Sequence, residues 1–273
     1  MMQFSMRPSR VLRKLRAGEI VHSFKLNFKD SRAIQIAASF GFDCMWLCRE
    51  HTPTDLGELE NQINAAKMFD VDVLCRVPRG SYSDYIRPLE MDAAGIIVPH
   101  VASAAEARQI VDWVRFHPLG RRAVDGGNID GQFCLVPVAD YMAHANRERL
   151  VILQIESPEA LEEVENICAV PGFDAILFGP GDFSHRIGKP GQIDDPQVVA
   201  ARRRVGAACQ ASGKIAVAAG LFAPLPELVA EGFRVFNVGA DVIGLAQYVK
   251  QRVALVADQA ATMAASAGGS PYA

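Results

Sequence analysis

Two acidic residues, each placed just beyond a short apolar run, carry the strongest chemical signal in this chain. Glu156 directly follows residues 151–155, and Asp182 lies shortly after residues 175–178. Both runs are too short for helices and lack strict alternation, so they predict strands buried on both faces. In parallel α/β folds the chemistry lies beyond the carboxyl ends of the strands. We therefore expect the two carboxylates at one rim, where they could hold a divalent metal ion.

The same two residues also admit a purely structural role. Glu156 could cap a helix that starts at Ser157, and Asp182 could cap one near Phe183. Capping and metal binding both remain open at this point.

A histidine on the same predicted rim could move protons. His51 follows the apolar run 44–48, and a histidine at the carboxyl end of a strand is well placed to act as a general base near neutral pH. His100 ends the fourth predicted strand and is a rival, and a structural role for His51 is the alternative.

Arg76 closes an apolar third strand, a setting in which an arginine needs a carboxylate or an anionic ligand. It would bind the keto-acid end of a substrate or stabilise an enolate. The alternative is an ion pair with Glu50 or Glu90 inside the fold.

Bulk composition narrows the class of protein. The chain has 273 residues, 50% of them hydrophobic, and a formal net charge of -3. It can bury a large core, and this length suits one α/β barrel spanning residues 1–273. No acidic or basic block beyond the N-terminus suggests nucleic acid or a charged membrane surface, and no run approaches the ~18 apolar residues of a membrane span. A small molecule is the expected partner.

Six cysteines form no CxxC pair and fall mostly in apolar contexts. We interpret them as reduced core residues of a cytoplasmic protein. The basic residues between positions 7 and 16 could belong to a transit peptide, but no apolar signal core follows. Val11, Leu12 and Leu15 instead favour a short amphipathic helix that closes the bottom of a barrel.

Strand-like runs alternate with helical patterns along the whole chain. Helices are expected at residues 31–40, 104–115, 158–169, 196–211 and 224–231. Eight alternating units favour a (β/α)8 TIM barrel over a doubly wound sheet, and nothing resembles a GxGxxG or Walker loop. The eight predicted strands are Val21–Leu26, Cys44–Cys48, Val71–Val77, Gly95–Val101, Leu150–Glu156, Ala175–Gly179, Lys214–Ala219 and Arg234–Val238.

Two segments interrupt this alternation. Residues 120–131 are too rich in glycine and polar residues for a regular element, so we expect a long loop, of a kind that is often functional, before a helix at 138–147. Residues 254–273 predict an additional C-terminal helix that exceeds the needs of the barrel. Its spare apolar surface suggests packing on a neighbouring subunit, although a solvated terminus is the alternative.

Taken in order, the motifs resemble the HpcH/HpaI family of class II pyruvate aldolases, within the phosphoenolpyruvate/pyruvate barrel superfamily. The resemblance covers nearly the whole chain, and no single motif decides it. The matching segments are Gly41-Phe42-Asp43, Glu50-His51, Arg76-Val77-Pro78, Ile97-Val98-Pro99, Gly120-Arg121-Arg122, Gln154-Ile155-Glu156, residues 179–184 and residues 238–241.

The resemblance implies metal-dependent cleavage of a 4-hydroxy-2-keto acid to an aldehyde and pyruvate, or hydroxypyruvate, through an enolate. It implies that Glu156 and Asp182 ligate Mg²⁺ or Mn²⁺, with Co²⁺ and Zn²⁺ as further candidates. It also implies His51, directly or through a water, as the base, and Arg76 as the group that polarises the pyruvyl carbonyl. The residues implied to bind substrate are Arg76, Gln154, Gly181, Asp182 and Ala219.

Three positions depart from the family pattern. Members usually carry an acidic residue where Cys48 stands, an aspartate paired with the base where Glu90 falls, and a glycine where Asp92 lies. Glu90 is expected to orient His51 with one extra methylene, and a shift of about 1 Å can cost about 100-fold in rate.

Other functions stay open beside the aldolase. A citrate-lyase-like enzyme acting on a hydroxyacyl-CoA thioester would need a basic groove for coenzyme A, and no clear cluster of that kind appears outside the N-terminal helix. Gly239-Ala240 could cradle a phosphate, and a non-catalytic barrel that binds metal and keto acid is a further reading. By the resemblance, the chain forms a homohexamer assembled as a trimer of dimers.

Overall fold

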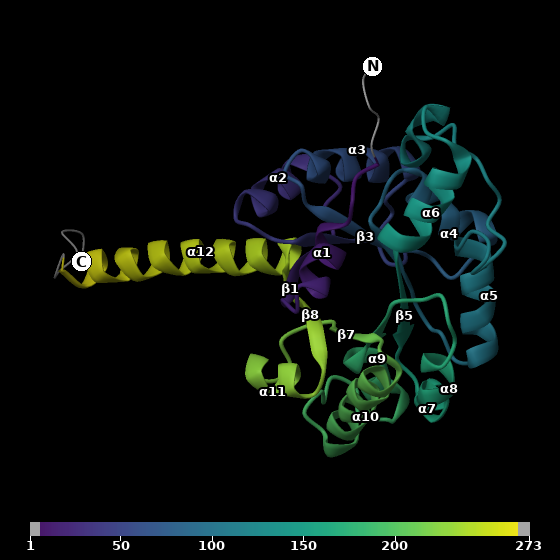
Figure 1. Cartoon of the computed structure of the whole chain (residues 1–273). Coiled ribbons are helices and arrows are strands. Elements are labelled where there is room, and N and C mark those ends of the chain that lie inside the picture. The colour runs from purple at the N-terminus through teal and green to yellow at the C-terminus, as the bar shows by residue number, and fades with distance from the viewer. Residues whose placement is uncertain (1–5, 267–273) are drawn as a thin grey trace.

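The computed structural model describes residues 6–266 and has a closed barrel of parallel strands surrounded by helices (Figure 1). The strands follow one another around the barrel in chain order, and β8 pairs with β1 to close it. This confirms the predicted (β/α)8 architecture. The strands are β1 (Val21–Leu26), β2 (Cys44–Cys48), β3 (Asp72–Arg76), β4 (Gly95–Val98), β5 (Leu150–Ile155), β6 (Ala175–Phe178), β7 (Ile215–Ala218) and β8 (Phe233–Ala240).

Helices alternate with these strands and cover the outside of the barrel. The predicted helix at 158–169 is divided into two short ones, the C-terminal helix starts at Asp241 rather than near residue 254, and the other helices expected by range agree within a few residues. Residues 56–67 and 82–90 form helices for which no range was predicted. Twelve α-helices occur within residues 6–266. They are α1 (Arg10–Arg16), α2 (Ser31–Ser39), α3 (Leu56–Lys67), α4 (Tyr82–Glu90), α5 (Ala104–Val114), α6 (Val138–Glu148), α7 (Pro158–Glu162), α8 (Val164–Cys168), α9 (Pro180–Arg186), α10 (Pro196–Ser212), α11 (Leu225–Ala230) and α12 (Asp241–Ser266).

Two apolar layers hold the barrel together. Every residue of β2 to β6 is buried, so their side chains pack both inside the barrel and against the helices. The interior cluster includes Trp46, Leu74, Ile152, Leu177 and Val217, while a larger cluster lies between strands and helices. This two-sided burial explains why the strands read as continuous apolar runs rather than as alternating ones.

Helix α1 closes the bottom of the barrel, as its amphipathic pattern predicted. Val11 and Leu12 are buried in the interior cluster. Two buried carboxylates at the amino ends of β2 and β3 fix the helix: Asp72 accepts from Ser9 Oγ at 2.6 Å and from the backbone N–H of Val11 at 2.9 Å. Asp43 binds Lys14 Nζ at 2.8 Å.

The glycine-rich segment 120–131 is mostly irregular, but its last three residues begin a short 3₁₀ helix, η1 (Ile129–Cys134). The expectation that no regular element occurs there is therefore wrong for Ile129 to Gly131. The cause is a buried cluster in which Asp130 accepts from Tyr141 Oη at 2.6 Å and from Arg122 at 3.1 Å. These contacts fix a turn that local composition does not reveal.

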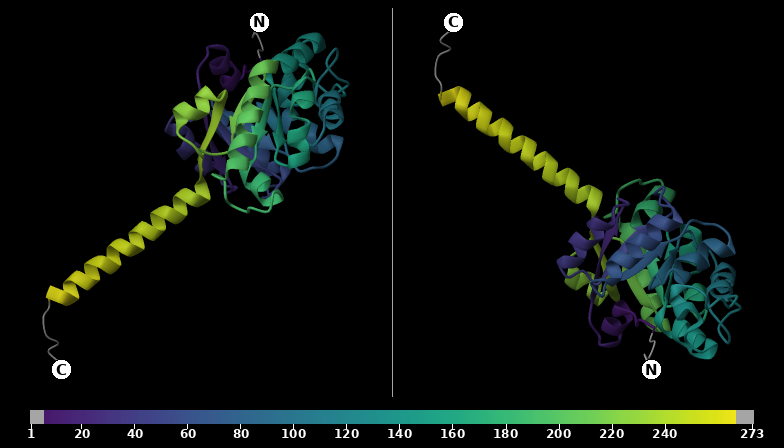
Figure 2. Two further views of the ribbon diagram at one scale, coloured as in Figure 1. Left: turned by 90° about the horizontal axis from the view of Figure 1, so that it is seen from below. Right: turned by 90° about the horizontal axis from the view of Figure 1, so that it is seen from above.

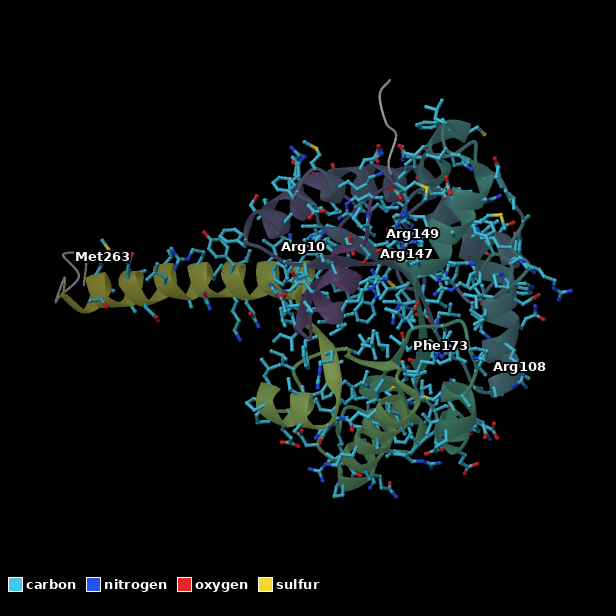
Figure 3. All side chains as sticks on the ribbon, viewed as in Figure 1. Arg10, Arg108, Arg147, Arg149, Phe173 and Met263 are labelled. Atoms are coloured by element: carbon cyan, nitrogen blue, oxygen red, sulfur yellow. The ribbon has the colours of Figure 1, made fainter. Side chains whose placement is uncertain are left out.

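Helix α12 starts directly after β8 and projects away from the barrel (Figure 2). Its side chains extend into open space as far as Met263, near its far end (Figure 3). The helix includes residues 254–266 of the predicted tail, and residues 267–273 lie outside the described part. Within residues 6–266, no helix combines the length and apolar character needed to cross a bilayer.

The Asp43 anchor gives a stability prediction with a defined pH dependence. Burial raises the pKa of Asp43, but bonds and charges from Lys14 and His22 outweigh burial and hold it below its usual 3.8. A carboxyl with a lowered folded pKa stabilises the fold above its unfolded pKa, and that stabilisation is lost as the pH falls through the folded pKa.

We expect Asp43→Asn to lower the free energy of unfolding by about 2 kcal/mol at neutral pH. The difference from wild type should shrink in acid, because wild-type Asp43 becomes protonated as the pH falls through its folded pKa. Urea unfolding at pH 7 and at about pH 3 measures this. Asp70→Asn is the control. The exposed Asp70 pairs with Arg7 and Arg13 at the surface and should contribute under about 1 kcal/mol to the free energy of unfolding. Equal losses in the two variants would contradict the anchor.

Candidate active site

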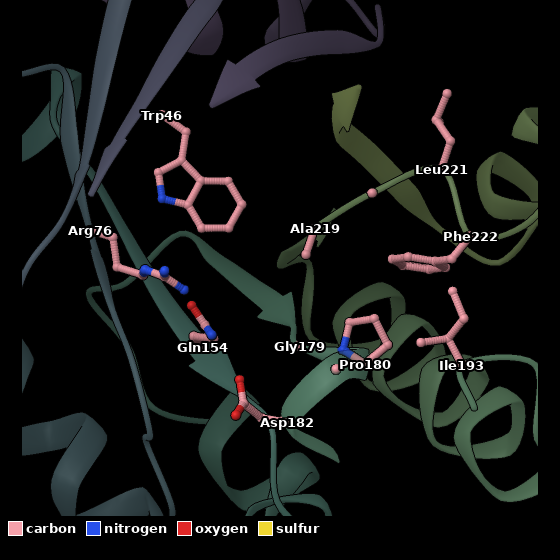
Figure 4. A pocket seen from close by; sticks show the side chains of 12 residues that line it. Trp46, Arg76, Gln154, Gly179, Pro180, Asp182, Ile193, Ala219, Leu221 and Phe222 are labelled. Carbon is pink, nitrogen blue, oxygen red and sulfur yellow. The ribbon is translucent and has the colours of Figure 1, made fainter. Parts of the chain in front are cut away.

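A cavity of about 380 Å³ opens at the carboxyl ends of the strands. One side carries the polar groups together with Trp46, and the other is an apolar wall formed by Ile193, Leu221 and Phe222 (Figure 4). All five residues expected to bind substrate line this cavity, namely Arg76, Gln154, Gly181, Asp182 and Ala219. The four apolar residues were not anticipated, although residues 220–222 directly follow β7 and could have been found by that position.

Glu156 is buried, with 2% of its surface exposed, and its carboxylate lies against two residues that line the cavity, Gln154 and Gly179. Its Oε1 accepts the backbone N–H of His100 at 2.9 Å, and its Oε2 accepts the side-chain amide of Gln154. The cap of α7 is Ser157, which accepts from Ala160, so Glu156 does not have the capping role considered from sequence. The position of Glu156 is therefore fixed by its contacts with His100 and Gln154 and not by capping of α7.

Asp182 reaches the cavity from the first turn of α9. The cap of this helix is Gly179, so Asp182 is not the cap either. Burial raises the pKa of Glu156, and the negative charge of Asp182 raises it further, while His100 and Gln154 lower it. The two carboxylates therefore repel each other, and a cation between them would relieve that repulsion.

The donor set suits a hard divalent cation. Gln154 Oε1 is buried beside the two carboxylates and has no hydrogen-bond partner. Within residues 6–266, no group of three or more His, Cys, Asp or Glu side chains converges on a single point. Two carboxylates with open positions for water or substrate oxygens fit Mg²⁺ or Mn²⁺ better than a closed tetrahedral zinc site.

Arg76 faces the cavity from the end of β3 and is held by three neighbours. Its Nε lies 3.0 Å from Glu50 Oε2, and its Nη2 donates to Cys48 Sγ at 3.1 Å. The guanidinium also lies over the Trp46 ring, 5.1 Å from the centroid. The ion pair with Glu50 that the sequence allowed is thus present, Arg76 also lines the cavity, and Cys48 supplies a weak acceptor where the family usually has an acid.

His51 lies at the rim with its side chain 59% exposed, and its Nε2 is 3.5 Å from Glu50 Oε2. The structure does not bring Glu90 to His51. Glu90 pairs instead with Arg122, whose Nη2 lies 4.0 Å from its Oε1, and it lines a separate cavity that includes Asn128 and Ile129. Burial raises the pKa of Glu90, only partly offset by Arg122.

Asp92, the third departure, adopts a left-handed backbone with φ of 68° and pairs with Arg149. A glycine tolerates such a φ without cost, and aspartate is among the residues that adopt it most readily. This departure therefore leaves the backbone geometry of the loop before β4 intact.

Residues 26–247 match the family model described as HpcH/HpaI aldolase/citrate lyase. This chain belongs to that family. A 2-keto-3-deoxy-L-rhamnonate aldolase from Escherichia coli O17:K52:H18 is 30% identical over 246 residues, covering 89% of this chain and 91% of that protein.

Solved structures agree with this assignment. An HpcH/HpaI aldolase from Desulfitobacterium hafniense DCB-2 is 30% identical with a TM-score of 0.84, covering 92% of this chain and 97% of that one. A solved structure of a citrate synthase is 27% identical with a TM-score of 0.83, and the match covers 91% of this chain and 97% of that one. The family and the barrel fold inferred from the motifs are both confirmed.

The close approach of Gly179 to Glu156 gives a second prediction. A methyl group on Gly179 would lie 2.8 Å from Glu156 Oε2, although its φ of -99° is one that alanine adopts freely. Gly179→Ala should therefore displace the carboxylate and weaken Mn²⁺ binding about tenfold or more, measured by titration calorimetry. Gly181→Ala is the matched control, since its methyl would meet no atom within 4 Å. Equal affinities in the two variants would show that Glu156 does not hold the ion.

Proposed function

We propose that this protein is a metal-dependent carbon–carbon lyase that cleaves a 4-hydroxy-2-keto acid to an aldehyde and pyruvate, or hydroxypyruvate. The observation that carries the proposal is the pairing of Glu156 and Asp182 beside a cavity that also presents Arg76. Family membership and the named aldolase relative support the same reaction class.

Glu156 and Asp182 would hold Mg²⁺ or Mn²⁺, and Co²⁺ or Zn²⁺ are the further candidates. When bound, the ion supplies a Lewis acid next to the 2-keto oxygen. The amides of Gly181 and Asp182 lie in the first turn of α9, where N–H groups have no acceptor within the helix. These amides are available to the carboxylate of the keto acid. Asp182 would thus contribute its side chain to the metal ion and its backbone N–H to the substrate.

Arg76 would stabilise the negative charge that develops on the pyruvyl oxygen as the carbon–carbon bond breaks. Its contacts with Glu50 and Cys48 keep the guanidinium fixed before substrate arrives. His51 would accept the proton of the 4-hydroxyl, directly or through a water. Because Glu50 is the carboxylate beside His51, Glu50 is the group that can orient this base.

The apolar wall indicates the kind of aldehyde. Ile193, Leu221 and Phe222 face the polar groups across the cavity, so the fragment beyond the broken bond meets hydrocarbon. A 2-keto-3-deoxy sugar acid ending in a methyl group fits that wall, and the named relative acts on such an acid. We propose this substrate class for the present chain.

Release of pyruvate or hydroxypyruvate from a panel of 4-hydroxy-2-keto acids, including 2-keto-3-deoxy-L-rhamnonate, tests the reaction. Activity should disappear with a chelator and return with Mg²⁺ or Mn²⁺. Glu156→Gln, Asp182→Asn and His51→Ala should each lower kcat/KM by at least about 100-fold, because each removes a group that acts on the reacting atoms.

Two other outcomes would contradict the proposal. Cleavage of a hydroxyacyl-CoA alone would point to the thioester lyase. Tight binding of metal and keto acid without turnover would point to a non-catalytic barrel.

Helix α12 supports a further proposal, that the chain is a homo-oligomer. Exposed apolar residues recur along this helix at helical spacing, namely Val242, Leu245, Val249, Val253, Val256 and Met263. A cavity of about 480 Å³ lies between the first two turns of α12 and helix α2, and Phe40 at its edge is 83% exposed. We propose that α12 of a second copy covers this apolar surface, with a hexamer built from three such dimers.

Substitutions on α12 test the assembly. Val253→Asp with Val256→Asp should reduce the mass measured by light scattering, because two charges would have to be buried in the interface. Gln251→Asp with Gln259→Asp is the control on the same helix and should leave the mass unchanged. A wild-type monomer, or an unchanged mass in the valine variant, would overturn this role for α12.

A further inference from the structure

His100 has a backbone conformation that calls for explanation. It follows β4 with a φ of 58°, in the left-handed region that residues other than glycine rarely adopt. Such conformations persist where surrounding contacts impose them, and they cluster at functional sites. The contacts that impose this conformation on His100 therefore bear on its function.

Both ring nitrogens of His100 lie against carboxylates. Nδ1 is 2.8 Å from Glu156 Oε1, in an ion-pair contact whose angle is poor for a hydrogen bond. The backbone N–H of His100 supplies the aligned bond to the same oxygen, at 2.9 Å. On the other side, Nε2 is 3.0 Å from Glu50 Oε1. One residue thus touches a proposed metal ligand with two of its groups.

The second carboxylate connects His100 to the cationic side of the site. Glu50 Oε1 faces His100, and its Oε2 is 3.0 Å from Arg76 Nε. At the far end of the series, Glu156 Oε2 accepts from Gln154. The contacts therefore run without a gap from Arg76 through Glu50, His100 and Glu156 to Gln154.

From this arrangement we infer that His100 is a positioning residue, which fixes the Glu156 carboxylate for the metal and couples it through Glu50 to Arg76. The inference rests on the proposed metal role of Glu156. A ligating carboxylate is normally held by hydrogen bonds, and loss of such a partner typically lowers metal affinity about 10- to 100-fold. The left-handed backbone follows from this role, because it directs the N–H and the ring of one residue to the same oxygen.

Two substitutions separate the ring from the backbone. His100→Gly keeps the backbone N–H and suits a positive φ, so it removes only the imidazole. His100→Asn also tolerates this φ and places a side-chain N–H near the position of Nδ1, but it does not reach Glu50. The first variant breaks both side-chain contacts, and the second restores only the one to Glu156.

Titration calorimetry of the full chain with Mn²⁺ alone provides a readout that needs no turnover. We expect the Kd of His100→Gly to rise about 10- to 100-fold and that of His100→Asn to stay within about threefold of wild type. Wild-type Kd in His100→Gly would overturn the inference, because the backbone N–H would then suffice. If wild type itself bound no Mn²⁺, the proposed metal site would fail instead, and the two failures are thereby distinguished.

The coupling to Arg76 has its own readout. His100→Asn removes the contact of His100 with Glu50 Oε1, so we expect a several-fold rise in KM for the keto acid at unchanged Mn²⁺ affinity. Glu50→Gln should raise KM similarly, since it removes the charge that faces Arg76. Unchanged KM in His100→Asn would restrict the role of His100 to the Glu156 side and overturn the coupling. Thermal unfolding of each variant checks that it folds.

Discussion

A buried negative charge is the constraint on which the rest of the site depends. Glu156 is almost fully buried, and the nearby Asp182 adds a second negative charge. Burying carboxylates without compensation is costly, so the surroundings must supply donors or a cation. His100 and Gln154 supply donors to Glu156, and Gly179 provides the space that its carboxylate occupies. A divalent ion would complete this balance.

The cationic side of the cavity shows how a family pattern tolerates substitution. Cys48 cannot supply a charge, yet its sulfur accepts from Arg76, while Glu50 supplies the carboxylate. The face of the Trp46 ring gives the buried guanidinium of Arg76 an additional favourable contact. Arg76 is therefore held by groups of three different kinds, and the loss of an acid at position 48 leaves it in place at the cavity.

The strand pattern and the motifs by themselves determined the barrel strands, the rim position of three polar residues and the family. Apolar runs of strand length gave all eight strands, because residues buried on both faces of a parallel barrel must be apolar regardless of tertiary detail. The rim positions of Glu156, Asp182 and Arg76 follow from the same rule, since each lies at or beyond the carboxyl end of a strand. Family membership followed from the order of the motifs.

Only the tertiary structure decided which side chains meet. His51 and His100 both follow strands, and sequence could not show that His100 touches Glu156 while His51 lies exposed at the rim. Glu90 lies beside Arg122 because Arg122 is fixed by contacts with Asp130, a contact between loop residues that has no periodic signature. The helical character of residues 254–266 was evident from composition, but the start of α12 at Asp241 and its projection from the barrel were not. The type of a residue largely predicts whether it is buried, whereas contacts between side chains of distant loops depend on the whole fold.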